Sequence, residues 1–303
     1  MSPLGRNWTL ITSLTLIPLG IIIQLICPLN YFKFNLFHMS PESLESVFAT
    51  RAAELREYIF AQPASTFKNN PWALATAIET FANTKRHMMI FRDKKLDVAR
   101  AQLAAQQPAP RTILEFGTFV GKSALAWAAI LRDIHGESVP AGVNVYTFEL
   151  DPQMVSLARD LVRLAGVDDV VHVLEGPASE SLTTLHARGV VTSVDMAFFD
   201  HWEQFYLPDL RLVEDLGLFR VGSLVIADNT DFPGAPEYLK YVKSGGRLDA
   251  GSVRYESVSY ETETQRGKPV SFVSCVDTWD ADADGSIECC GSQYRGLCEL
   301  IRL

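Results

Sequence analysis

The sequence predicts an α/β protein with a doubly wound, mostly parallel sheet of seven strands, preceded by N-terminal helices. Five short apolar runs alternate with amphipathic segments between residues 112 and 228. Repeated alternation of this kind is typical of a parallel sheet covered by helices on both faces. Two of the runs, 194–200 and 224–228, stop abruptly at a carboxylate, as buried parallel strands do. Two further apolar runs follow without a helix between them and complete the predicted sheet.

Composition narrows the classes of protein to which the chain can belong. Its 303 residues suffice for one large domain with an extension. Hydrophobic residues make up 48% and charged residues 21%, which is ordinary for a globular protein. The net charge of −9 and the lack of a basic stripe in the sequence argue against nucleic-acid binding. The sequence does not indicate an oligomeric state.

The first 38 residues form a membrane-anchor or signal-like segment. Residues 7–32 carry no charged side chain, and about 20 apolar residues span a bilayer. We expect membrane association through residues 8–29, because no A-x-A-like cleavage site follows the apolar run as a secretory signal would require. Arg6 and Lys33 flank it almost symmetrically and leave its orientation open. A product that starts at Met39 would instead be cytoplasmic.

Residues 39–110 are expected to be helical. One helix begins near Pro41, with Ser40 or Ser43 as its N-cap, a second begins at Trp72, and a third covers 92–103. Pro108 and Pro110 then end the helical region and introduce the sheet.

The α/β core is expected over residues 111–277. Its amphipathic segments include residues 152–165 and 207–218. The predicted strands, in chain order, are Thr112–Phe116, Val143–Leu150, Val170–Glu175, Val194–Asp200, Leu224–Asp228, Val253–Tyr260 and Pro269–Asp277.

A glycine turn follows the first strand and favours a cationic ligand. Gly121-Lys122-Ser123 resembles the end of a P-loop, which would indicate an NTPase. However, only three residues separate Gly117 from Gly121, and a P-loop needs four. Glu115 would also repel a phosphate. S-adenosylmethionine, with its amino group and sulfonium, suits carboxylates better: Glu115 would accept from the amino group and Glu149 from the ribose hydroxyls. The alternative is that both acids only cap helices.

A second set of polar residues favours a metal ion. Asp200, Asp228 and Asn229 follow two strands whose carboxyl ends line the ligand crevice of an open α/β sheet. This all-oxygen set suits a hard cation such as Mg²⁺. A helix cap is the alternative for a single strand-end acid. His201 is a further candidate ligand, although a packing or hydrogen-bonding role is the more common one for such a histidine.

The stretch between residues 78 and 243 resembles the catechol O-methyltransferase family. The most specific run begins at Asp195 and contains Asp-His-Trp at 200–202 and Tyr-Leu-Pro-Asp at 206–209. Ala-Asp-Asn at 227–229 and Pro-Gly-x-Pro at 233–236 continue it. Phe-Glu-Leu-Asp-Pro at 148–152 and Leu-Ala-Gly-Val at 164–167 also match.

The resemblance implies a class I methyltransferase with a Rossmann-like fold that methylates one hydroxyl of a small aromatic diol. It implies Mg²⁺ held by Asp200, Asp228 and Asn229. It implies S-adenosylmethionine held by Met89, Phe91, Glu115, Gly117, Ser123, Glu149, Asp200 and Trp202. The substrate would contact Asn229, Pro233 and Trp202.

Three departures from the family affect the expected activity. Glu203 stands where the family has its general base, a lysine, so we expect weaker or differently tuned catalysis. His87 replaces a gatekeeper tryptophan, and Glu261 or Glu263 would have to supply the late glutamate that grips the second hydroxyl. A homologue that binds cofactor and metal without turnover is therefore the alternative function.

Residues 278–303 form a tail that diverges from the family. Four of the five cysteines lie in the last thirty residues, but they form no CxxC pair of the kind that binds zinc. Residues 280–287 imitate the start of an EF-hand loop, yet position twelve is Gly291 rather than glutamate. A solvated acidic turn is therefore expected in place of a calcium site.

Overall fold

The computed structural model describes residues 41–136, 139–230, 234–247, 252–263 and 269–274. The predicted membrane segment and the divergent tail lie outside these ranges. The chain divides into two compact units, residues 1–50 and residues 51–303. Among the described residues, no helix is both long and apolar enough to cross a bilayer.

The three predicted N-terminal helices are present. They are α3 (Pro41–Phe60), α4 (Pro71–Thr84) and α5 (Asp93–Ala105), with a short 3-10 helix, η1 (Ala64–Thr66), between the first two. The start of α4 is fixed locally, because the Asn70 side chain accepts a hydrogen bond of 3.0 Å from the amide of Ala73 and proline occupies the first helical position.

The predicted doubly wound, mostly parallel sheet is confirmed. The strands within the described residues form one sheet in the order β3-β2-β1-β4-β5-β7-β6. The first five run parallel, and the last two pair antiparallel at one edge. Their bounds are β1 Thr112–Phe116, β2 Asn144–Glu149, β3 Val171–Glu175, β4 Val194–Phe199, β5 Phe219–Ala227, β6 Val258–Glu263 and β7 Pro269–Ser274.

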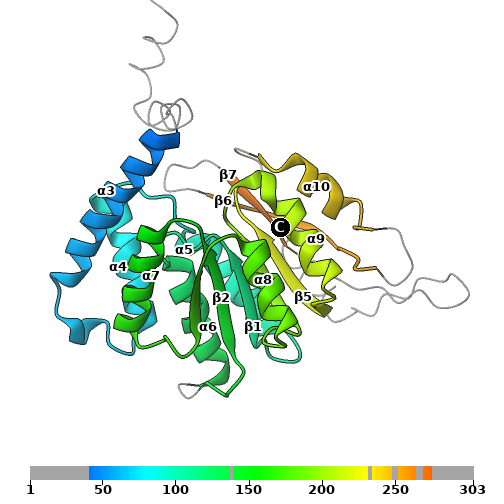
Figure 1. The fold of residues 1–303 in the computed structure, drawn as a ribbon, viewed down its shortest axis with the longest axis horizontal. Coiled ribbons are helices and arrows are strands. Elements are labelled where there is room, and N and C mark those ends of the chain that lie inside the picture. Colours follow the sequence, from blue (N-terminus) through cyan, green and yellow to red (C-terminus); the bar gives the residue numbers. More distant parts are fainter. Residues whose placement is uncertain (1–40, 137–138, 231–233, 248–251, 264–268, 275–303) are drawn as a thin grey trace, which may run out of the picture. The chain divides into compact units, whose positions relative to one another are not determined.

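Helices cover both faces of the sheet (Figure 1). One face carries α6 (Lys122–His135) and α7 (Pro152–Ala165), with α4 packed outside them. The other face carries α8 (Ala178–Ala187), α9 (Tyr206–Asp215) and α10 (Pro236–Lys243). Because both faces are covered, all six residues of β4 are buried, which explains the uninterrupted apolar run in the sequence.

A buried acid, Asp195, joins the amino ends of three neighbouring strands. One carboxylate oxygen accepts from the amides of Arg111 (2.6 Å) and Thr112 (2.8 Å) at the start of β1. The other accepts from the Arg220 guanidinium of β5, at 2.6 Å from Nε. Asp195 is only 6% exposed, so these bonds lie in a medium where they are strong. They fix the positions of β1, β4 and β5 relative to one another along the strand direction. They therefore also fix the relative positions of the carboxyl ends, which carry the predicted site.

The strand order reverses between β1 and β4, so their connections leave on opposite faces of the sheet. A ligand crevice is expected at such a point. The chain leaves β1 through Gly117, whose φ of +99° disfavours other residues. A side chain there would also meet the end of β4, because an added Cβ would lie 2.6 Å from the carbonyl oxygen of Asp200.

We therefore predict that Gly117→Ala is severely destabilising. Gly176→Ala is a matched control, since its φ is +116° and nothing lies within 4 Å of an added Cβ. The control should cost about 1–3 kcal/mol for backbone strain alone. Gly117→Ala should cost clearly more, because the Asp200 backbone must also move. Urea unfolding of both variants measures the difference, and equal losses would contradict the close approach.

Candidate functional site

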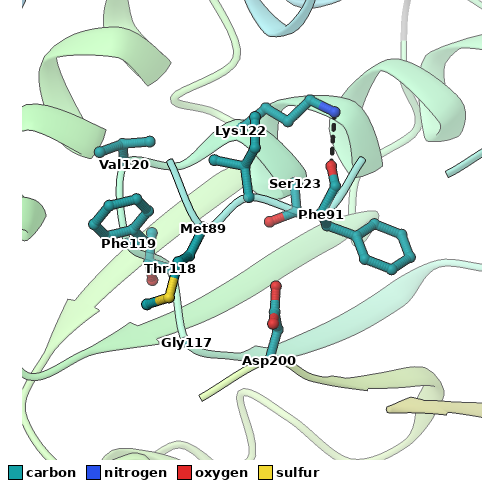
Figure 2. Close-up of a pocket in the computed structure, with 10 residues that line it drawn as sticks. Met89, Phe91, Gly117, Thr118, Phe119, Val120, Lys122, Ser123 and Asp200 are labelled. Carbon is teal, nitrogen blue, oxygen red and sulfur yellow. Dashed lines mark hydrogen bonds between the residues drawn. The ribbon is translucent and has the colours of Figure 1, made fainter. Parts of the chain in front are cut away.

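A pocket opens at the carboxyl end of β1, between the glycine turn and the segment that precedes α5 (Figure 2). It brings together five of the predicted cofactor residues, Met89, Phe91, Gly117, Ser123 and Asp200. Figure 2 shows the Asp200 carboxylate pointing towards the glycine turn and the Ser123 hydroxyl. The rest of its lining is Ile90, Thr118, Phe119, Val120 and Lys122.

The shape of the glycine turn follows from its backbone. Gly117, Phe119 and Gly121 all have positive φ, and α6 begins directly after Gly121. The first turn of α6, from Lys122, therefore faces the pocket with unpaired amides and the positive end of the helix dipole. Such a helix start suits an anionic group, for example the carboxylate of an amino-acid ligand.

Glu115 lies beneath this turn as a buried, hydrogen-bonded acid. Its carboxylate accepts from the Trp127 indole (2.9 Å) and the Thr147 hydroxyl (2.6 Å), and the side chain is fully buried. Burial raises the pKa of Glu115 to about 7, although hydrogen bonds from Thr147, Ser123 and Trp127 oppose the shift. Glu115 does not line the pocket, so its predicted contact with an amino group stays a prediction.

Glu149, at the end of β2, is held against the same turn. Its two oxygens accept from the backbone amides of Phe119 (2.7 Å) and Asp151 (3.0 Å). Burial raises the pKa of Glu149, and hydrogen bonds from backbone amides lower it in part. Each carboxylate oxygen can accept a further bond, so a contact with ribose hydroxyls remains chemically available.

The two predicted metal-binding aspartates come together. Burial and the nearby charge of Asp228 raise the pKa of Asp200 well above its usual value, and the Lys95 ammonium opposes this. Lys95 and Asp228 are both buried and form a direct ion pair. Asn229 follows with a φ of +53°.

The donor set fits a divalent cation in its chemistry. Within the described ranges, no three His, Cys, Asp or Glu side chains form a metal cluster, so an amide would have to supply the third protein ligand. Asp200 and Asp228 are two oxygen donors whose mutual repulsion a cation would relieve. Lys95 already supplies one positive charge there, and a metal ion would have to share Asp228 with it.

His201 has the packing role that was weighed against metal binding. Its Nε2 lies 2.8 Å from Asp209, and its ring stacks on Tyr206 with centroids 5.3 Å apart. Both interactions hold the chain just beyond Asp200, so they help to place that carboxylate.

The remaining predicted residues lie around the site or outside the described residues. Trp202 does not line the pocket, and it is 55% exposed. Glu203 begins the 3-10 helix η2 (Glu203–Phe205), is half-buried, and has a pKa raised chiefly by burial. Pro233 lies outside the described residues, and so do the side chains of Glu261 and Glu263.

Sequence reasoning missed the two lysines that matter at the site. Lys95 follows Lys94 in a polar helix, where a solvated side chain is the ordinary expectation, and Lys122 drew attention only as part of a P-loop-like motif. Both are buried and paired with acids distant in sequence, and no local pattern signals such pairs.

Comparisons with known proteins agree with the fold and the site. Residues 114–230 match a methyltransferase domain model. The O-methyltransferase of Bacillus cereus in complex with SAH has a similar structure, with a TM-score of 0.52 and 21% identity over 67% of this chain and 89% of that one. The chain therefore has the fold of a class I methyltransferase.

Sequence relatives identify the family. The chain is 31% identical to catechol O-methyltransferase of Mus musculus over 201 residues, which are 66% of this chain and 69% of the mouse protein. It is 33% identical to catechol O-methyltransferase of Bos taurus over 180 residues, 59% of this chain and 62% of that protein. This protein belongs to the catechol O-methyltransferase family, a family of methyltransferase enzymes.

Because the pKa of Glu115 is raised in the folded protein, we expect the free energy of unfolding to depend on pH. The pKa of the Glu115 carboxyl is about 7 in the folded protein, against an ordinary value of 4.5, so the native state binds this proton more readily than the unfolded chain does. Its contribution to stability is present at low pH and is lost as pH rises from about 4.5 to 7, a change on the order of 3 kcal/mol. Glu115→Gln removes this term, so the variant should gain stability relative to wild type as pH rises from 5 to 7.5.

Urea unfolding of both proteins at the two pH values measures this shift. Glu180→Gln, on the exposed surface of α8, is the control and should keep a constant difference from wild type. If Glu115→Gln also kept a constant difference, Glu115 would be ionised throughout this range.

Proposed function

We propose that this protein transfers a methyl group from S-adenosylmethionine to one hydroxyl of a catechol, assisted by Mg²⁺. The observation that carries the proposal is that Asp200 and Asp228 directly follow the paired residues Phe199 and Ala227 of neighbouring parallel strands, with Asp200 lining a pocket at the glycine turn. Membership of the family supports the same chemistry. Membrane association through residues 8–29 stays part of the proposal, on the sequence alone.

In this proposal, residues of the pocket and the neighbouring Glu149 contact different parts of the cofactor. The start of α6, with Ser123, faces the amino-acid end, and Gly117 lets the ligand approach the backbone. Glu149 takes the ribose hydroxyls. Asp200 would serve both the cofactor and the cation; its place in the pocket lining and the effect of the nearby Asp228 charge on it support this double role.

Asp200, Asp228 and Asn229 would hold the metal ion. A bound Mg²⁺ supplies a positive charge that acidifies a nearby hydroxyl, and bound S-adenosylmethionine supplies an electrophilic methyl group. Lys95 would orient Asp228, because the two buried side chains form a direct ion pair.

Glu203 is the proposed proton acceptor. Its carboxylate would take up the proton of the hydroxyl that accepts the methyl group. Burial and the charge of Asp228 raise the pKa of Glu203, which makes it a stronger base than an ordinary glutamate. The exposed Trp202 beside it would form an apolar wall for the aromatic ring, with Pro233 completing the wall.

The second candidate function is binding of cofactor and metal without turnover. It is favoured by the carboxylate at position 203, because another negative charge close to Asp228 opposes a catecholate in the same place. The two functions differ in whether product forms, and not in ligand binding.

The full-length protein, purified in detergent, should convert catechol to its O-methyl ether with S-adenosylmethionine and Mg²⁺. EDTA should abolish the product and excess Mg²⁺ should restore it, because the proposed cation positions the hydroxyl. Chromatography of the product measures both effects. Cofactor binding without product would favour the second candidate, and absence of cofactor binding would overturn both.

Glu203→Gln should lower kcat by roughly 10²-fold, the usual effect of losing a general base. The wild-type rate should rise with pH through the raised pKa of Glu203, because the base is active only when ionised. This acid limb should be absent in Glu203→Gln. The surface variant Glu180→Gln should retain both rate and profile.

Glu203→Lys tests the departure from the family directly. A gain in rate would show that the carboxylate weakens catalysis at this position. An unchanged rate in Glu203→Gln would remove Glu203 from the mechanism.

A further inference from the structure

We propose that Lys122 is a positioning residue that holds the Met89–Phe91 backbone against the glycine turn and thereby sets the affinity for the cofactor. This inference rests on the proposed function, since it assumes that the pocket takes S-adenosylmethionine. It assigns a role to a residue that local sequence reasoning linked only to phosphate binding.

The Lys122 ammonium is surrounded by acceptor groups of the protein. It donates to the carbonyl of Phe91 at 2.7 Å and to the carboxylate of Asp93 at 2.6 Å. It also forms an ion pair with Glu79 at 2.9 Å, without the alignment of a hydrogen bond. The side chain is 1% exposed. An ammonium has three N–H groups, so these contacts leave little capacity to bind a ligand directly.

Figure 2 shows the direction of the side chain: it runs across the top of the pocket to the Phe91 carbonyl. A P-loop lysine would instead reach towards a bound phosphate. A buried cation in the first turn of α6 also opposes the helix dipole, and its desolvation is costly. The acceptor groups around the ammonium offset these costs. Because one of them is the Phe91 carbonyl, the contacts connect the start of α6 to the segment that precedes α5.

That segment depends on side chains for its position. Residues 86–92 lie outside any helix or strand, so no ladder of backbone hydrogen bonds fixes them. Arg92 donates to the carbonyl of Met88 at 3.1 Å and also reaches Glu79 at 3.2 Å. Lys122 fixes the carbonyl of Phe91 and shares Glu79. Arg92 and Lys122 therefore bind the carbonyls at the two ends of Met88–Phe91, and the buried Glu79 carboxylate contacts both cations.

Met89, Phe91 and Lys122 all border the pocket, so a movement of this segment changes the shape of the pocket. Glu203, the proposed proton acceptor, follows β4 and does not line this pocket. Loss of the Lys122 contacts should therefore weaken cofactor binding more than it slows the reaction of bound cofactor.

The test compares Lys122→Met with Lys94→Met in the full-length protein. Lys94 is exposed near the start of α5 and serves as the matched control. In Lys122→Met, the Kd for S-adenosylhomocysteine, measured by calorimetry, and the KM for S-adenosylmethionine should rise on the order of tenfold, the worth of about one hydrogen bond. The value of kcat at saturating cofactor should change less than about twofold. Lys94→Met should match wild type.

Amide hydrogen exchange of the ligand-free protein provides a second readout. Exchange of residues 86–92 should increase in Lys122→Met, while β1 and β4 stay protected. If loss of the Lys122 charge beside the buried Glu79 prevents folding, the double variant Lys122→Met/Glu79→Gln removes the glutamate charge as well and should show the same changes.

Unchanged affinity in a folded variant, or a uniform rise in exchange across β1 and α6, would overturn the proposal. A kcat loss without a KM change would overturn it as well. Failure of the wild-type protein to bind S-adenosylhomocysteine would instead overturn the proposed function, whereas the exchange experiment would still test the contact itself.

Discussion

The crowding of buried carboxylates at one edge of the sheet is the constraint on which the site depends. Glu115 in β1, Glu149 at the end of β2 and Asp200 just after β4 belong to three neighbouring strands, and burial raises the pKa of each. Asp228 adds a fourth acid from β5, and Lys95 is its direct cationic partner. Such an arrangement costs stability unless positive charge or hydrogen bonds offset it. A sulfonium ligand and a divalent cation would supply the positive charge that this edge lacks.

The acids differ in how the protein stabilises them, and this difference divides their roles. Glu115 is enclosed by the Trp127 and Thr147 side chains, which support the floor of the site. Glu149 is bound by backbone amides and fixes the glycine turn. Asp200 lines the pocket, and burial together with the charge of Asp228 raises its pKa, so a cationic ligand would offset an unfavourable charge there.

Two buried lysines hold the N-terminal helices to this edge. Lys95, in α5, reaches Asp228 after β5, and Lys122, in α6, reaches the segment just before α5. The N-terminal helices therefore contribute to the site rather than merely precede the core. At the opposite end of the strands, the hydrogen bonds of Asp195 fix the positions of β1, β4 and β5 along the strand direction. The acids at their carboxyl ends are therefore held at the same edge of the sheet.

The sequence by itself determined the order of the elements and the strand ends that carry the acids. Apolar runs and the glycine turn are local signals, and most elements formed close to where those signals placed them. Two strands differ: the predicted strand Val253–Tyr260 is β6 at Val258–Glu263, and β5 begins at Phe219 rather than at Leu224. Only the tertiary structure decided that Glu115 is enclosed and that His201 pairs with Asp209. It also decided that Lys95 meets Asp228, 133 residues away. Such pairings depend on which side chains the packed sheet and helices bring together, and no local pattern encodes that choice.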